Sequence, residues 1–104
     1  MPEFKSAFVH TVFFWLNEPT KENLAKLKEG VLSLSAVETI SAGHIGTPAS
    51  TRRAVIDHSY DLSLTFIFKD KQAQDIYQDH PLHTSFVENY KHLWSKVQVY
   101  DAVG

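Results

Sequence analysis

The 104-residue sequence contains no cysteine, and this absence excludes disulfide bonds and every form of thiol catalysis. It also contains no run of about 18 apolar residues, so we expect no membrane-spanning helix. Residues 1–6 lack the basic stretch and following apolar run that mark a secretory signal. We therefore expect a cytoplasmic protein with no membrane partner.

Glycine and clustered positive charge are also scarce. With only 4 glycines, the chain has neither a glycine-rich phosphate loop nor a Gly-x-Ser-x-Gly motif. We therefore expect no nucleotide cofactor, no other cofactor and no serine nucleophile. The net charge is −2, and Arg52-Arg53 is the only adjacent basic pair. Because nucleic-acid binding depends on basic patches that neutralise phosphates, we expect no nucleic-acid partner.

Hydrophobic and aromatic residues are plentiful. Hydrophobic residues make up 43% of the chain and include 7 Phe, 4 Tyr and 2 Trp. A chain of this length folds as one domain and buries roughly two-thirds of its unfolded surface. We found no repeat, low-complexity tract or linker. The sequence therefore predicts a single domain over residues 1–104, with its core at about residues 7–102.

The hydrophobic pattern predicts an α+β fold. Thr20 and Asp70 are placed to cap two helices, and His80-Pro81 should end the second helix and let Pro81 begin a third. β-Branched and aromatic runs predict strands at residues 7–16, 37–45, 60–68 and 95–102. The order is β-α-β-β-α-β, the ferredoxin-like sandwich pattern.

The first predicted strand is apolar on both of its faces. One face carries His10 among large hydrophobic residues, and the other carries Val9, Phe13 and Trp15. A strand exposed to water on one side alternates polar with apolar residues, so this strand should be covered twice. Helices cover only one face of such a sheet. We therefore expect a homodimer in which two sheets face each other and form a dimeric α/β barrel.

Three histidines and one tyrosine could carry chemistry. His10 lies among apolar side chains, where an unbonded polar group is costly, and it could simply be a hydrogen-bonded core residue. His80 could bond the free amide end of the following helix or point to solvent. His83 could exchange a proton near neutral pH, with the Tyr77 hydroxyl assisting. Tyr77 could equally pack its ring in the core.

Metal binding is a further possibility for a chain with 6 histidines. The pair His80 and His83 lacks the carboxylate companion of a zinc-binding helix, and there is no cysteine to add a ligand. His44 and His58 lie elsewhere in the sequence. We therefore expect no metal site.

The chain resembles the stress-responsive A/B barrel (Dabb) family over about residues 7–102. The resemblance depends on His10 in the first strand, on the string Tyr77-x-x-His80-Pro81-x-His83, and on Asp101 near the end of the last strand. It implies a homodimeric barrel with a cavity between sheet and helices in each subunit. The antibiotic-biosynthesis monooxygenases share this fold, but a fold alone does not give a function.

More distantly, the same segment is similar to the olivetolic acid cyclases, which close a linear polyketide by aldol condensation without a cofactor. This resemblance implies that His83 is the general base and Tyr77 its assisting hydroxyl. The cyclases carry a further pocket histidine where alignment places Leu62, which leaves the substrate open. The substrate-binding residues we expect are His10, Leu62, Phe86 and His80.

Three functions remain open from the sequence. The first is a dimeric barrel that binds a small apolar molecule, with a few polar groups to orient it. The second is a cofactor-free cyclase or lyase that removes a proton next to a carbonyl. The third is a structural dimer module without a ligand, in which the histidines bond only to the protein.

Overall fold

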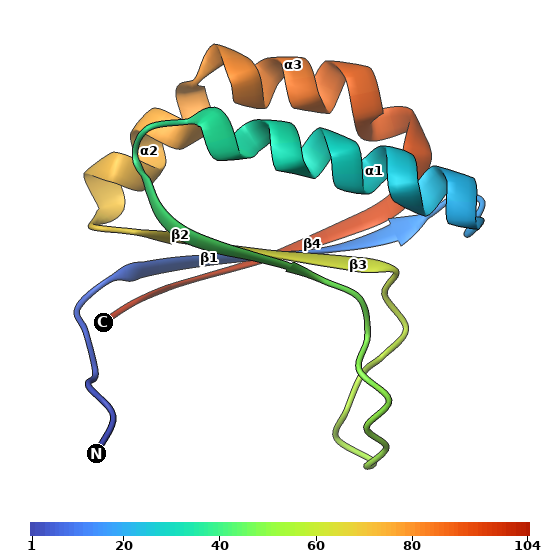
Figure 1. Ribbon diagram of the computed structural model, residues 1–104, viewed down its shortest axis with the longest axis horizontal. Helices are drawn as coiled ribbons and strands as arrows, with labels where there is room; N and C mark the ends of the chain where they lie inside the picture. Colours follow the sequence, from blue (N-terminus) through green and yellow to red (C-terminus); the bar gives the residue numbers. More distant parts are fainter.

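A four-stranded antiparallel sheet with helices on one face forms the architecture (Figure 1). The computed structural model describes all 104 residues. The strand order is β2-β3-β1-β4, and the β-α-β-β-α-β pattern predicted from the sequence is confirmed. The elements are β1 (Phe8–Leu16), α1 (Lys21–Ser33), β2 (Ile40–Gly46), β3 (Leu62–Phe68), α2 (Lys71–Asp79), α3 (Pro81–Tyr90) and β4 (Trp94–Val103).

Side-chain caps fix where each helix begins. The Thr20 hydroxyl accepts a hydrogen bond from the Asn23 amide at 3.1 Å, and the Asp70 carboxylate accepts one from the Ala73 amide at 2.9 Å. Such bonds satisfy amide groups that a helix leaves without partners in its first turn. Pro81 begins α3 directly after α2 ends, so the chain changes direction there without a loop.

Two strands, β2 and β3, begin two or more residues later than the sequence pattern predicts. β2 begins at Ile40 because residues 34–36 form a turn of 3₁₀ helix, which is closed by a bond from the Val37 amide to the Leu34 carbonyl. β3 begins at Leu62, because the Asp61 amide bonds to the Phe14 carbonyl and the Asp61 carboxylate accepts from the Leu16 amide. The amide and the carboxylate of Asp61 therefore both bond to β1, just before the paired residues of β3 begin.

The core lies between the helices and the inner face of the sheet. Along β1 every second residue is buried, from Phe8 to Leu16, and this face includes His10. Gly30 allows α1 and α3 to lie close together, because a Cβ there would lie 2.8 Å from the Tyr90 ring. No helix is both long and apolar enough to cross a membrane.

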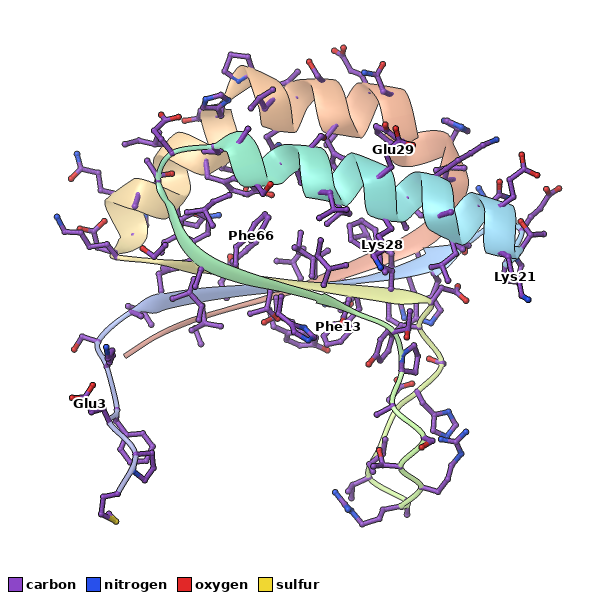
Figure 2. The ribbon with its side chains drawn as sticks, in the orientation of Figure 1. Glu3, Phe13, Lys21, Lys28, Glu29 and Phe66 are labelled. Carbon is purple, nitrogen blue, oxygen red and sulfur yellow. The ribbon has the colours of Figure 1, made fainter.

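No helix covers the other face of the sheet. Phe66 points toward the helices and Phe13 points away from them, on opposite faces (Figure 2). The Phe13 ring packs edge-on against Tyr60 and Tyr100, with centroids at 4.8 and 6.2 Å. The N-terminal segment and the segment between β2 and β3 both extend beyond this face (Figure 1). An aromatic surface is thus left open between two extended segments.

Candidate ligand pocket

A cavity of about 400 Å³ lies between α3 and the edge of the sheet formed by β1 and β4. Ten of its fourteen lining residues are hydrophobic, a larger share than in any other hollow described below. Its apolar wall comes from the inner face of the sheet and from α3, and includes Val12, Phe14, Val97, Val99 and Phe86. This combination of concave shape and apolar lining is typical of small-molecule sites.

Two other hollows, of about 440 and 410 Å³, lie beside the edge strand β2. Only half of their lining residues are hydrophobic, five of ten and four of eight. Neither includes His10, Tyr77 or His83. The cavity under α3 is therefore the better candidate for a site.

Three polar side chains meet at one end of this cavity. The Tyr77 ring contacts the His10 ring, with centroids 5.7 Å apart, and the His83 ring, with centroids 5.1 Å apart. Tyr77 comes from the last turn of α2 and His83 from the first turn of α3, so the break at Pro81 brings them together. His10 approaches from β1 on the floor. Helix, turn and strand thus converge on one point.

His10 is held by a carboxylate. Its Nδ1 lies 2.6 Å from an Asp101 carboxylate oxygen, and β-sheet register places the two residues directly opposite each other on β1 and β4. A carboxylate can only accept, so Nδ1 carries a hydrogen and donates it. Nε2 forms no hydrogen bond within the chain, and His10 lines the cavity. Asp101 therefore fixes which imidazole nitrogen remains available to a ligand.

His83 is held by a relay of amides. Gln74 donates to the Gln78 carbonyl oxygen at 2.9 Å, and the Gln78 amide nitrogen lies 3.3 Å from Nε2 of His83. An amide nitrogen only donates, so Nε2 is the unprotonated nitrogen of a neutral ring. Burial lowers the pKa of His83, and the electrostatic effect of the neighbouring His10 lowers it further. His83 is thus kept as a neutral imidazole that can accept a proton.

Tyr77 is almost completely buried, with 1% of its surface exposed. Its ring packs against Phe66 and Phe68 as well as against the two histidines. Burial raises its pKa above the usual value, so the hydroxyl keeps its proton and can donate it in a hydrogen bond. No residue of the chain accepts a hydrogen bond from this hydroxyl. The Tyr77 hydroxyl is therefore a hydrogen-bond donor without a partner in the chain, and its ring lies beside the neutral His83 imidazole.

The direction of the His83 shift predicts a pH dependence. We expect the His83 imidazole to titrate with a midpoint below 6.5, as followed by NMR of the ring carbons, with His83→Gln assigning the signal. Because the unfolded chain binds this proton more readily, the free energy of unfolding should fall as pH decreases through 6.5 and the folded-state pKa. His83→Gln should flatten that part of the curve. A midpoint at or above 6.5 would contradict the burial described here.

Four of the six predicted site residues line the cavity: His10, Tyr77, His83 and Phe86. His80 does not, because its Nδ1 accepts a hydrogen bond from the Leu82 amide at 3.1 Å and caps α3. Leu62 does not line it either. It is fully buried and borders the hollow beside α1 and β2, whereas Leu64, two residues further on the same face of β3, lines the cavity.

Sequence reasoning assigned no role to three residues that the structure places at the site. Asp101 was noted only as an acidic residue at the end of a strand, and its contact with His10 depends on the β1–β4 register. Gln78 lies within the Tyr77–His83 string, so its position next to Tyr77 was a usable signal. Lys91 follows α3 directly and lines the cavity. No three metal-ligating side chains lie close enough together to share an ion.

Comparison with known proteins agrees with this fold. A dabb family protein from Mesorhizobium loti with a ferredoxin-like fold is 25% identical, with a TM-score of 0.76 and coverage of 96% of this chain and 98% of that one. An Arabidopsis thaliana protein is 21% identical, with a TM-score of 0.76 and coverage of 93% and 94%. A dimeric ferredoxin-like protein of unknown function from Thermobifida fusca is 16% identical, with a TM-score of 0.74 and coverage of 98% and 95%. No curated protein matches the chain.

The sheet, its helices and these relatives define a ferredoxin-like α+β protein. The model of the Stress responsive A/B Barrel Domain family (Dabb) matches residues 8–103. The chain belongs to this family.

Proposed function

We propose that this protein is a homodimer in which each subunit binds one small apolar molecule in the cavity under α3. The observation that carries the proposal is an apolar cavity with His10, Tyr77 and His83 gathered at one end. A cavity of about 400 Å³ lies in the usual size range of small-molecule sites. An apolar ligand with one oxygen function would satisfy the hydroxyl and imidazole groups that the protein leaves free.

The open face of the sheet supports the homodimer. Val9, Phe13 and Trp15 lie on this face without a covering helix, and single domains rarely expose contiguous apolar patches of this kind. A second copy offers the same surface, so a two-fold axis would cover both. The related protein from Thermobifida fusca is described as dimeric, as is one from Jannaschia.

Blocking the cavity tests the binding function. We expect Val99→Trp to fill the cavity and to abolish binding of an apolar probe such as octanol, measured by isothermal titration calorimetry. Val103→Trp is the matched control, because Val103 lies on the same face of β4 but does not line the cavity. Equal octanol binding by both variants and the wild type would place the ligand elsewhere and overturn the proposal.

A charge on the open face tests the dimer. We expect Phe13→Asp to lower the mass measured by sedimentation from twice the chain mass to 11.8 kDa, because a carboxylate cannot be buried unpaired in an aromatic interface. Leu32→Asp is the control, since Leu32 is 51% exposed on α1 at the helical side. Circular dichroism checks that both variants remain folded. A wild-type protein that sediments at 11.8 kDa at micromolar concentration would refute the homodimer.

A second candidate function is enzymatic. The observation that favours it is the neutral His83 beside the free Tyr77 hydroxyl in an apolar cavity. His83 could remove a proton from a carbon next to a carbonyl group, and Tyr77 could donate a hydrogen bond to the oxygen that becomes negative. No cofactor is needed for such a step. Its test is argued in the Discussion.

A further inference from the structure

The cavity has a second polar end, formed by Lys91. This residue is exposed and lines the cavity, so it lies where the cavity meets solvent. Lys91 forms no ion pair with any carboxylate of the chain, whereas Lys26 and Lys71 each pair with a carboxylate four residues away. The nearest acidic residue in sequence, Glu88, does not line the cavity. A positive charge without a partner thus lies at the opening.

The two polar ends are far apart. His83 and Lys91 are separated by eight positions along α3 and the turn that follows, which corresponds to about 12 Å at the rise of an α-helix. The sheet gives a similar length. His10 and Phe14 are four residues apart on β1, which corresponds to about 13 Å at the rise of a strand. The Phe14 ring packs on Trp94, which is three residues from Lys91 in the sequence. The stretch between the ends is lined by hydrophobic side chains, including Val12, Val97 and Val99. The cavity is therefore an elongated apolar channel with one cation at its mouth.

The charges around this channel favour one sign of ligand. No Asp or Glu side chain lines it. The nearest carboxylate on the floor, Asp101, is engaged by His10 at 2.6 Å. At the mouth, an anion would meet a free ammonium group, whereas a ligand cation would meet only repulsion.

We propose that the ligand is an elongated apolar carboxylate, with its carboxylate against Lys91 and its hydrocarbon chain extending toward Tyr77. This inference rests on the proposed binding function and adds the ligand class to it. The carboxylate remains partly hydrated at the mouth, which avoids the cost of burying a charge. The chain occupies the apolar stretch, and any oxygen at its far end meets His10, Tyr77 and His83.

The experiment compares three probes of equal chain length, octanoate, octanol and octylamine, by isothermal titration calorimetry at pH 8 and low salt. We expect octanoate to bind more tightly than octanol and octylamine to bind least. Lys91→Gln should weaken octanoate about fivefold, as for an exposed ion pair, and should weaken octanol by less. Added salt should reduce the preference for octanoate. Lys28→Gln is the control, because it removes the same charge from α1 beside the other hollows.

The outcomes separate this inference from the binding function. If octanol binds as tightly as octanoate and Val99→Trp abolishes both, the cavity binds ligands but the carboxylate inference is overturned. The inference is also overturned if Lys28→Gln, rather than Lys91→Gln, weakens octanoate. If none of the three probes binds and none raises the melting temperature, both the inference and the binding function fail.

Discussion

Replacing Phe68 with alanine is expected to lower the free energy of unfolding by about 3–5 kcal/mol. Phe68 is fully buried, and its ring contacts the rings of Phe8, His10, Phe66 and Tyr77. The substitution would remove a fully buried ring, the second largest of the fully buried side chains after Tyr77, and leave a cavity that the surrounding rings cannot fill. It would also remove aromatic edge contacts, which add to the loss from burial alone.

Urea unfolding monitored by circular dichroism measures this loss. The protein concentration is kept fixed, because the proposed dimer would dissociate on unfolding. The control is Ile76→Ala, which shortens a 44% exposed side chain on the outer side of α2. It should cost about 1 kcal/mol or less, since most of its surface is not removed from water on folding. A loss of similar size in the two variants would show that Phe68 does not lie in a close-packed core.

The fold could be predicted because its signals are local. The alternation along β1, the caps at Thr20 and Asp70, and the break at His80-Pro81 each depend on residues only a few positions apart. The β-α-β-β-α-β order predicted a sheet with helices on one side only, and the apolar character of both faces of β1 predicted that a second copy covers the other side. Element boundaries were less accurate, because the start of β3 depends on how Asp61 bonds to its neighbour strand.

The candidate site could be predicted only in part. Tyr77 and His83 belong to one recognisable string and lie on consecutive helices, so their proximity followed from the break between them. The pair His10 and Asp101 joins residues 91 positions apart, and only the register of β1 against β4 determines that they meet. A shift of that register by one residue would place Asp101 on the opposite face.

The assignments of Leu62 and His80 show two other limits of sequence reasoning. Leu62 faces the core like Leu64, because residues two apart share a face of a strand. Periodicity cannot say which of the two lies under α1 and which lies under α3. His80 was predicted both as a site residue and as a partner for a helix amide, and the structure has it in the second position. The orientation of a ring at a helix start depends on backbone angles that the sequence pattern does not contain.

The polar end of the cavity combines groups with different proton states. His83 is neutral, its Nε2 lone pair accepts only the 3.3 Å bond from the Gln78 amide, and Tyr77 retains its hydroxyl proton. A neutral base next to a neutral donor is the arrangement needed to move a proton from carbon while an oxygen becomes negative. Asp101 does not touch the cavity and acts through His10, so it is a positioning residue.

If the cavity is an enzyme site, replacing His83 with alanine should slow proton removal from carbon by about 10²–10⁴-fold. The probe is 2-octanone in D₂O, and NMR measures the rate at which deuterium replaces the hydrogens next to its carbonyl. His83 takes a proton from that carbon, the carbonyl becomes an enolate held by the Tyr77 hydroxyl, and the carbon then accepts a deuteron that His83 has exchanged with solvent. Tyr77→Phe should slow exchange by about 10²-fold, since it removes one donor to the enolate oxygen and preserves the packed ring.

Two comparisons distinguish chemistry from a loss of structure. His92→Ala removes an exposed histidine that does not line the cavity and should leave the exchange rate unchanged. Asp101→Asn keeps the size of the side chain but can donate to Nδ1 of His10, so it should alter the His10 tautomer observed by nitrogen NMR while His83 stays neutral. If wild-type protein exchanges 2-octanone no faster than buffer while octanol still binds, His83 and Tyr77 serve only to hold a ligand. If wild-type protein exchanges 2-octanone quickly and His83→Ala exchanges it at the same rate, the base is another residue. His10, held by Asp101, is then the next imidazole in the cavity to test.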